Sequence, residues 1–221
     1  MRDERGQPVF GARDQADLAK VAAVGLPFWL AGSLGTPEAV GAAVAAGATG
    51  VQVGTVFALS ADSGLTPELR ARLLAGLRAG DLEVLTDGDA SPTGFPFKVV
   101  QLEGTLSDPA LRAARPRLCD LGYLRSPYRK DDGRVGYRCP AEPVEMFVRK
   151  GGSADDAAGR ACLCNALSAD VGLGQTRPDG RTEEALVTLG SDLDGARRLA
   201  ELHPDGWSAD QVLDWLLSPG R

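Results

Sequence analysis

Two short segments near the start of the chain combine glycine with a hydroxyl side chain, each directly after a short apolar run. They are Ala31-Gly32-Ser33 and Gly54-Thr55. Where a strand passes through a turn into a helix, unpaired backbone N–H groups and the positive end of the helix dipole favour an anion. Glycine lets the backbone approach such a ligand closely, because it has no Cβ atom. Both segments are therefore candidate phosphate-binding turns.

The same glycines have a simpler explanation, since tight connections between strands and helices need glycine without any ligand. Residue spacing alone leaves both interpretations open. It does exclude a dinucleotide-binding fingerprint, because Gly32 and Gly35 lack the Gly-x-Gly-x-x-Gly pattern and no acid ends the next strand.

The elements around these turns follow the order helix, strand, helix, strand, helix, which is typical of parallel α/β architecture. Helical spacing is present over 14–24, a continuous apolar run predicts a buried strand over 26–31, and a second strand is predicted over 50–53. Consecutive parallel strands end at the same edge of a sheet, so the two turns are expected to lie side by side.

Two helix starts carry the same three residue types, Thr-Pro-Glu at 36–38 and at 66–68. Each provides a hydroxyl N-cap, a proline at the first helical position and an acid in the first turn. The first helix is expected to turn Val40 and Val44 inward. The second is expected to bury leucines spaced four residues apart and to end at Gly80.

Beyond residue 85 the pattern becomes irregular. Residues 86–97 are rich in turn formers, 98–102 predict a short strand, and 109–152 predict little regular structure except a hairpin with its turn at 131–133. Further helices are expected at three places, namely 164–169, 193–201 and after Ser208, which forms a capping box with Gln211.

The segment that holds both turns resembles the C-terminal barrel strands of the flavin-dependent nitronate monooxygenase family. Members have an Ala-Gly-Gly-like turn and then Gly-Ala-x-Gly-Val-Gln-x-Gly-Thr-x-Phe. Here the second motif is Gly-Ala-Thr-Gly-Val-Gln-Val-Gly-Thr-Val-Phe over 47–57, and Ser33 replaces the usual second glycine. Segments 90–98, 137–143 and 162–165 resemble a long-chain bacterial subgroup of that family.

The resemblance implies a fold, a cofactor and a set of binding residues. The expected fold is α/β, with the last βα units of a (β/α)8 TIM barrel over 1–85. A family-specific, largely irregular and helical extension over 86–221 then holds the hairpin, the cysteines and the terminal helices. The implied cofactor is FMN, its phosphate held by the turns and Gln52 close to it. The implied cofactor-binding residues are Ala31, Gly32, Ser33, Gln52, Gly54 and Thr55.

The activity implied by the resemblance is FMN-dependent oxidation of alkyl nitronates, a small-molecule substrate, with oxygen. The family's catalytic histidine comes from the middle of the barrel, before the strands present here. The single histidine, His203, matches no family catalytic motif, and a lone histidine near a helix end favours a surface or capping role. No catalytic residue is therefore assigned.

The chain is accordingly expected to lack the N-terminal half of such an enzyme. Parallel strands need cover on both faces, so another chain or a further segment is expected to complete the barrel. Two alternatives stay open. One is an NAD(P)H-dependent flavin or enoyl reductase of the same barrel family, and the other is a non-catalytic truncated module used for association.

The cysteines also leave two interpretations open. Cys119, Cys139, Cys162 and Cys164 could assemble a tetrahedral zinc site, because thiolates are preferred zinc ligands. Their spacings are not those of a known zinc ribbon, and free cysteine is among the most buried residue types. We therefore expect buried structural thiols and assign no metal ligand. No Cys-x-x-Cys motif supports a redox pair.

Two other charged patterns have simple explanations. Asp87-Gly-Asp89 and Asp192-Leu-Asp194 resemble calcium loops but lack the ligand spacing and closing glutamate of an EF-hand, so turn and helix-cap roles are preferred. A solvated face is preferred over an anion site for the basic side chains of the hairpin, which are Arg125, Arg129, Lys130, Arg134 and Arg138.

The charge pattern excludes several partners. The net charge of the 221 residues is −6 and no basic cluster is present, which argues against nucleic acid and anionic membranes. Between Val21 and Ala61 only Glu38 is charged, but Pro27 and Pro37 interrupt this stretch, which favours buried strands over a membrane span. Without an export signal, reduced thiols and a cytoplasmic protein are expected.

Overall fold

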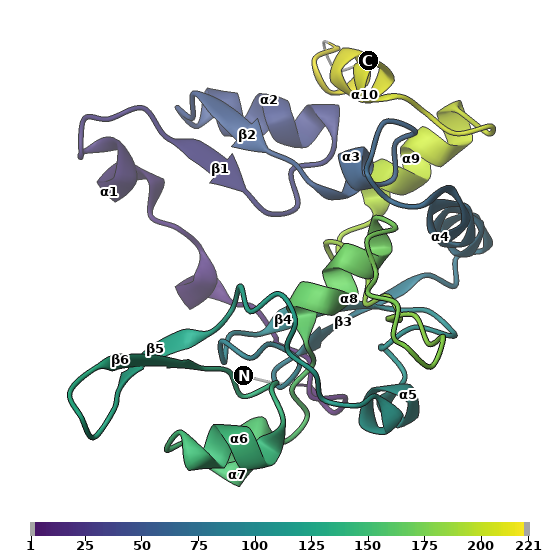
Figure 1. The fold of residues 1–221 in the computed structure, drawn as a ribbon. Coiled ribbons are helices and arrows are strands. Elements are labelled where there is room, and N and C mark those ends of the chain that lie inside the picture. The colour runs from purple at the N-terminus through teal and green to yellow at the C-terminus, as the bar shows by residue number, and fades with distance from the viewer. Residues whose placement is uncertain (1–2, 219–221) are drawn as a thin grey trace. The chain divides into compact units, whose positions relative to one another are not determined.

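The alternation of helix and strand expected from the sequence is present in the computed structural model, which describes residues 3–218 (Figure 1). The α/β class is thus confirmed. The first elements are a 3-10 helix η1 (Ala12–Asp14), α1 (Leu18–Ala22), β1 (Trp29–Ala31), α2 (Pro37–Ala45), β2 (Gly50–Gln52), α3 (Thr55–Ala58) and α4 (Pro67–Ala79).

The chain divides into two compact units. Unit 1 comprises the described residues up to Glu83 together with those from Leu189 onward, and unit 2 comprises Val84–Thr188. The boundary predicted after residue 85 lies beside the first division. The second division, after residue 188, has no counterpart in the sequence prediction.

In unit 1, β1 and β2 are parallel neighbours, as the sequence predicts. Trp29 pairs with Gly50, and Ala31 pairs with Gln52. β1 is shorter than the predicted strand 26–31, because only its last three residues find partners in β2. The predicted burial of this strand is wrong, because the described residues leave Leu26 and Trp29 exposed.

The Thr-Pro-Glu signals begin both helices. The hydroxyl of Thr36 accepts a hydrogen bond from the Ala39 N–H, and that of Thr66 accepts one from the Leu69 N–H, each at 3.3 Å. In α4 the leucines spaced four residues apart are buried, and Gly80 ends the helix with a φ of 80°.

The expected inward face of α2 is wrong in part. Val44 is 53% exposed, whereas Ala43 is buried. α2 packs on β2, and the residues that it buries are Pro37 and Ala43.

Unit 1 is completed by the last two helices, α9 (Asp194–Leu202) and α10 (Ala209–Leu216). α9 packs on α3 and α4, and α10 packs on α2 and α3. Between them, the buried indole of Trp207 donates from Nε1 to the Val56 carbonyl at 2.7 Å. The predicted capping box of α10 is present, with Ser208 and Gln211 bonded reciprocally.

Unit 2 contains more regular structure than the sequence predicts. Its elements are β3 (Glu83–Asp87), β4 (Phe97–Gln101), α5 (Pro109–Ala114), β5 (Ser126–Arg129), β6 (Val135–Arg138), α6 (Val144–Arg149), α7 (Ala154–Ala157) and α8 (Leu163–Asp170). The predicted hairpin is confirmed as the antiparallel pair β5–β6. The expectation of an irregular stretch over 109–152 is wrong where α5 and α6 form.

One apolar cluster holds unit 2 together. Its buried members come from β4, α8 and the loops around them, namely Ala90, Val99, Leu106, Ala161, Leu163, Ala166 and Leu186. The segment after residue 184 runs along β4, with the Val100 N–H bonded to the Val187 carbonyl at 2.9 Å.

The sheets formed by residues 3–218 are three separate pairs, β1–β2, β3–β4 and β5–β6. In the same residues, no helix has the length and apolar character needed to cross a membrane.

Candidate functional site

The two predicted turns leave the sheet side by side. β1 ends at Ala31 and β2 ends at Gln52, and these two residues are register partners in the parallel pair (Figure 1). Both strands therefore end at the same level, and the chain turns toward α2 after one and toward α3 after the other. The arrangement brings Gly32, Ser33 and Gly54 to one edge of the sheet.

The first turn has an unusual backbone. Gly32 has a φ of 96° and Ser33 a φ of 55°, and Ser33 is the only non-glycine residue with positive φ within 3–218. A left-handed conformation costs a residue with a Cβ about 1–2 kcal/mol. Backbone strain of this kind clusters at functional sites, where the surrounding structure maintains it.

The second turn places a hydroxyl at the start of a helix. Gly54 is the N-cap of α3 and Thr55 is its first residue. The Thr55 Oγ1 accepts a hydrogen bond from the Gly190 N–H at 2.9 Å, which leaves the hydroxyl proton available for donation.

Open space lies in front of both turns. A Cβ atom built on Gly32 or on Gly54 would meet no other atom within 4 Å. Ser33 and Gln52 are exposed at the same edge, while Thr55 is half-buried. The polar groups of the two turns are thus accessible from solvent.

A third segment, for which the sequence predicts only turn and cap roles, contacts Thr55 of the second turn and Gly35, which lies just after the first turn. Gly190 bonds to Thr55, and Gly195 lies against Gly35 so closely that a Cβ atom on it would come within 1.9 Å of the Gly35 carbonyl oxygen. The start of α9 therefore approaches the first turn. The only local signal was the pair of glycines that flanks the aspartates of this segment.

The aspartates of the two calcium-like sequences have the predicted turn roles. The Asp192 carboxylate accepts the Asp194 N–H at 3.1 Å, and the Asp87 carboxylate accepts the N–H groups of Asp89 and Ala90, each at 2.8 Å. Asp87 is also paired with Arg112 at 2.8 Å.

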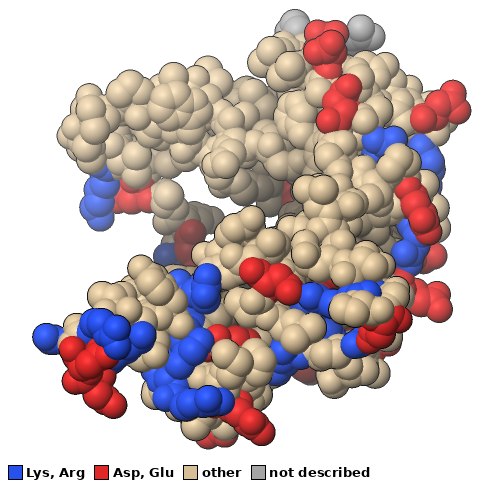
Figure 2. Space-filling model, in the orientation of Figure 1, with Lys and Arg blue, Asp and Glu red and all other residues tan. Residues whose placement is uncertain are grey.

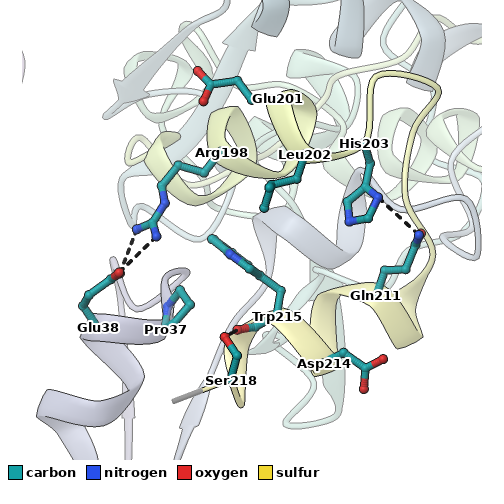
Figure 3. Close-up of a pocket in the computed structure, with 10 residues that line it drawn as sticks. All are labelled: Pro37, Glu38, Arg198, Glu201, Leu202, His203, Gln211, Asp214, Trp215 and Ser218. Carbon is teal, nitrogen blue, oxygen red and sulfur yellow. Dashed lines mark hydrogen bonds and ion pairs between the residues drawn. The ribbon is translucent and has the colours of Figure 1, made fainter. Parts of the chain in front are cut away.

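A pocket of about 670 Å³ lies beside the start of α2. Figure 3 shows the side chains that line it, with Arg198 bonded to both carboxylate oxygens of Glu38 at 2.7 and 3.0 Å. The hydrogen bonds from Arg198 hold the pKa of Glu38 at about 2. The guanidinium also lies over the Trp215 ring, 5.2 Å from its centre.

The single histidine lines this pocket too. His203 Nδ1 is 3.2 Å from the Gln211 side-chain nitrogen, and the His203 N–H bonds to the Leu199 carbonyl as the C-cap of α9 (Figure 3). His203 thus stands at the C-terminal end of α9, the position that the sequence predicts for it.

The basic side chains of the hairpin mostly have partners of their own. Arg134 is paired with Asp132, and Arg138 donates to the Lys150 carbonyl and lies over the Tyr128 ring. Figure 2 shows Lys and Arg mixed with Asp and Glu on the face of unit 2 that carries this hairpin. These contacts favour the predicted solvated face.

The cysteines are brought together in unit 2. All four are free thiols that line one small cavity, Cys139 and Cys162 buried and Cys119 and Cys164 half-buried. The expectation of buried thiols is therefore confirmed for Cys139 and Cys162.

Comparison of the chain with protein-family models, with curated proteins and with solved structures finds no match.

Proposed function

We propose that this chain provides the flavin-phosphate site of an FMN-dependent oxidoreductase of the nitronate monooxygenase type. The observation that carries the proposal is the pairing of Ala31 with Gln52, because it aligns the ends of β1 and β2 and the turns that follow them. Paired strand ends with glycine turns are the arrangement by which (β/α) barrels hold a phosphate.

The residues of the two turns fit an anionic group. The exposed turn at Gly32 and Ser33 offers backbone N–H groups and a hydroxyl, and Thr55 offers a hydroxyl proton. The open space at Gly54 allows close approach of a ligand. Gln52 would contact the flavin. Bound FMN would accept electrons from an alkyl nitronate and pass them to oxygen.

The proposal includes further strands that complete a barrel around β1 and β2. Leu26, Trp29 and Val44 are 68%, 61% and 53% exposed. Figure 2 shows almost no charged side chains over α2 and β2. Parallel sheets are covered on both faces in folded proteins, so strands from another chain or a further segment would bury this surface.

Two alternative functions are separable from this one. A flavin or enoyl reductase of the same barrel family would use the same turns but take electrons from NAD(P)H. A non-catalytic association module would use the apolar surface alone. The exposed apolar residues around β1, Leu26 and Trp29, favour this second alternative for the chain by itself.

The decisive experiment is flavin retention by the purified chain. We expect an absorption band of FMN to remain after mixing and desalting. Gly54→Val should weaken FMN binding about tenfold or more, since its side chain would fill the space where the phosphate approaches and lost charge-assisted hydrogen bonds are each worth about 1.5–3 kcal/mol.

The matched control is Gly41→Ala in α2, where an added Cβ also meets no atom within 4 Å but lies away from both turns. This variant should bind FMN like the unmodified chain. Failure of the chain to retain FMN, alone or with strands supplied in trans, would refute the proposal. With FMN bound, oxidation of an alkyl nitronate would indicate the nitronate monooxygenase activity. Oxidation of NAD(P)H would indicate the reductase.

A further inference from the structure

Every cysteine of the chain lies at one place in unit 2. Cys119 precedes β5, Cys139 directly follows β6, and Cys162 and Cys164 begin α8, yet all four line the same cavity. Cys139, Ala141 and Cys162 form one buried cluster, and Cys164 packs against it. Three separate segments of the chain thus contribute thiols to the lining of one cavity.

The segments that carry the thiols are fixed to one another by polar contacts. Asp120, next to Cys119, accepts a hydrogen bond from the Asn165 side chain in α8 at 2.6 Å. Arg117 donates to the Pro140 carbonyl at 2.9 Å and also to the Ala157 carbonyl. The backbone positions of the thiols are therefore set by neighbours and not by the thiols themselves.

We propose that Cys119, Cys139, Cys162 and Cys164 bind one divalent zinc ion as a structural four-thiolate site. Thiolates select soft metals, and four of them complete the tetrahedral shell that zinc adopts in structural sites. The cavity that they line measures about 10 Å³, which is about the room that one water-sized sphere needs.

Charges of both signs surround the cavity, since Glu142 lines it together with Arg125. Four thiolates and one Zn²⁺ carry a net charge of −2, which nearby cations would offset. Arg125 acts electrostatically on Cys119, Arg115 on Cys162, and Arg117 on Cys139. Three guanidinium groups are thus distributed among three of the four sulfurs.

Burial opposes the thiolate form at two of the sulfurs, and a backbone N–H partly offsets this at each. Burial raises the pKa of Cys139 to about 11, while the Ala141 N–H opposes that rise. Burial likewise raises the pKa of Cys162, opposed by the Asn165 N–H. Zinc binds cysteine as thiolate, so zinc binding would release protons, as it does at other thiolate sites.

The thiols as placed do not form a finished ligand shell. Within residues 3–218, no three His, Cys, Asp or Glu side chains are arranged to hold a metal ion. A cysteine has a single side-chain torsion, so rotation of the thiols about χ1 is the movement that would close the shell. A purely structural role for buried thiols does not explain why all four cysteines line one cavity.

The test is metal analysis of the purified full chain. We expect one zinc ion per chain after dialysis against metal-free buffer, released by a mercurial thiol reagent. Replacement with Co²⁺ should give the sulfur-to-cobalt charge-transfer band and the visible bands of tetrahedral cobalt thiolate. Cys139→Ser should reduce zinc content to below one-tenth of this level.

The control is Glu145→Gln, which removes an exposed carboxylate close by in α6 and should leave one zinc ion bound. If Cys139→Ser does not fold, the cobalt spectrum of the unmodified chain still decides. Absence of stoichiometric zinc with no cobalt–thiolate band, a disulfide among the four cysteines, or an iron chromophore with acid-labile sulfide would each overturn the proposal.

Discussion

At the scale of single residues, Asp170 is the carboxyl group whose surroundings most oppose its charge. It ends α8, is only 5% exposed, and its Oδ1 has no hydrogen-bond partner. Burial raises the pKa of Asp170 to about 7, and the Leu186 N–H only partly opposes this rise. The group is therefore a source of pH-dependent stability.

The sign of that dependence follows from proton binding. Between pH 4 and pH 7 the folded chain holds a proton on Asp170 that the unfolded chain has released, since its ordinary pKa is 3.8. The stabilisation by the protonated carboxyl group is complete below the pKa of Asp170 in the unfolded chain. It is lost as the pH rises through the pKa of Asp170 in the folded chain. We expect Asp170→Asn to raise the free energy of unfolding at pH 8 by about 1–3 kcal/mol.

Urea unfolding at pH 5, 6 and 8 checks this expectation. At pH 5 the free energies of unfolding of Asp170→Asn and of the unmodified chain should differ little. Between pH 5 and pH 8 the variant should lose less stability than the unmodified chain. Parallel stability curves for variant and unmodified chain would show that Asp170 ionises normally in the folded state.

At the scale of elements, the start of α9 depends on a residue with no side chain. Gly195 lies so close to the Gly35 carbonyl that any Cβ would overlap backbone, which cannot move as a flexible side chain does. Gly195→Ala should therefore lower the free energy of unfolding by about 1–3 kcal/mol, as overpacking does elsewhere.

The same substitution in α2 is the comparison. Gly41→Ala meets open space, and alanine is favoured over glycine within a helix by about 0.5–1 kcal/mol. The midpoint temperatures of thermal unfolding of the two variants should therefore shift in opposite directions. Equal shifts for the two variants would mean that Gly195 is not packed against Gly35 in solution.

Local signals predicted elements well where capping is local. Thr36 and Thr66 begin their helices as expected, and Ser208 with Gln211 caps α10. The start of α5 carries the same kind of signal, since Asp108 accepts the Ala110 N–H, yet the turn-rich sequence around it concealed the helix.

Long-range contacts were beyond such signals. Alternation of helix and strand was enough to place the turns after β1 and β2 side by side. The two glycines did not indicate that Gly190 bonds to Thr55 or that Gly195 approaches Gly35, because these contacts join segments more than 130 residues apart. Such contacts arise only from packing of the whole unit.

At the scale of the whole molecule, unit 1 is formed by both ends of the described chain, with unit 2 inserted between them. α9 and α10 cover α3 and α4, but the described residues leave the strand flanks around Leu26 and Trp29 exposed. The Trp29 indole lies against Gly50 and occupies the space that a Cβ atom on Gly50 would need. An uncovered parallel pair with an exposed indole is unusual in a stable protein.

This surface leads to a prediction about the chain on its own. We expect it to bind the hydrophobic dye ANS and to associate as its concentration rises, since large exposed apolar patches mark interaction sites. Trp29→Lys should reduce both effects, as measured by dye fluorescence and by light scattering after size exclusion. The control is Phe95→Lys in unit 2, where another aromatic ring is 74% exposed but lies outside the β1–β2 surface. A monomeric chain without dye binding, or equal effects of both substitutions, would contradict the view that strands outside the described residues cover β1 and β2.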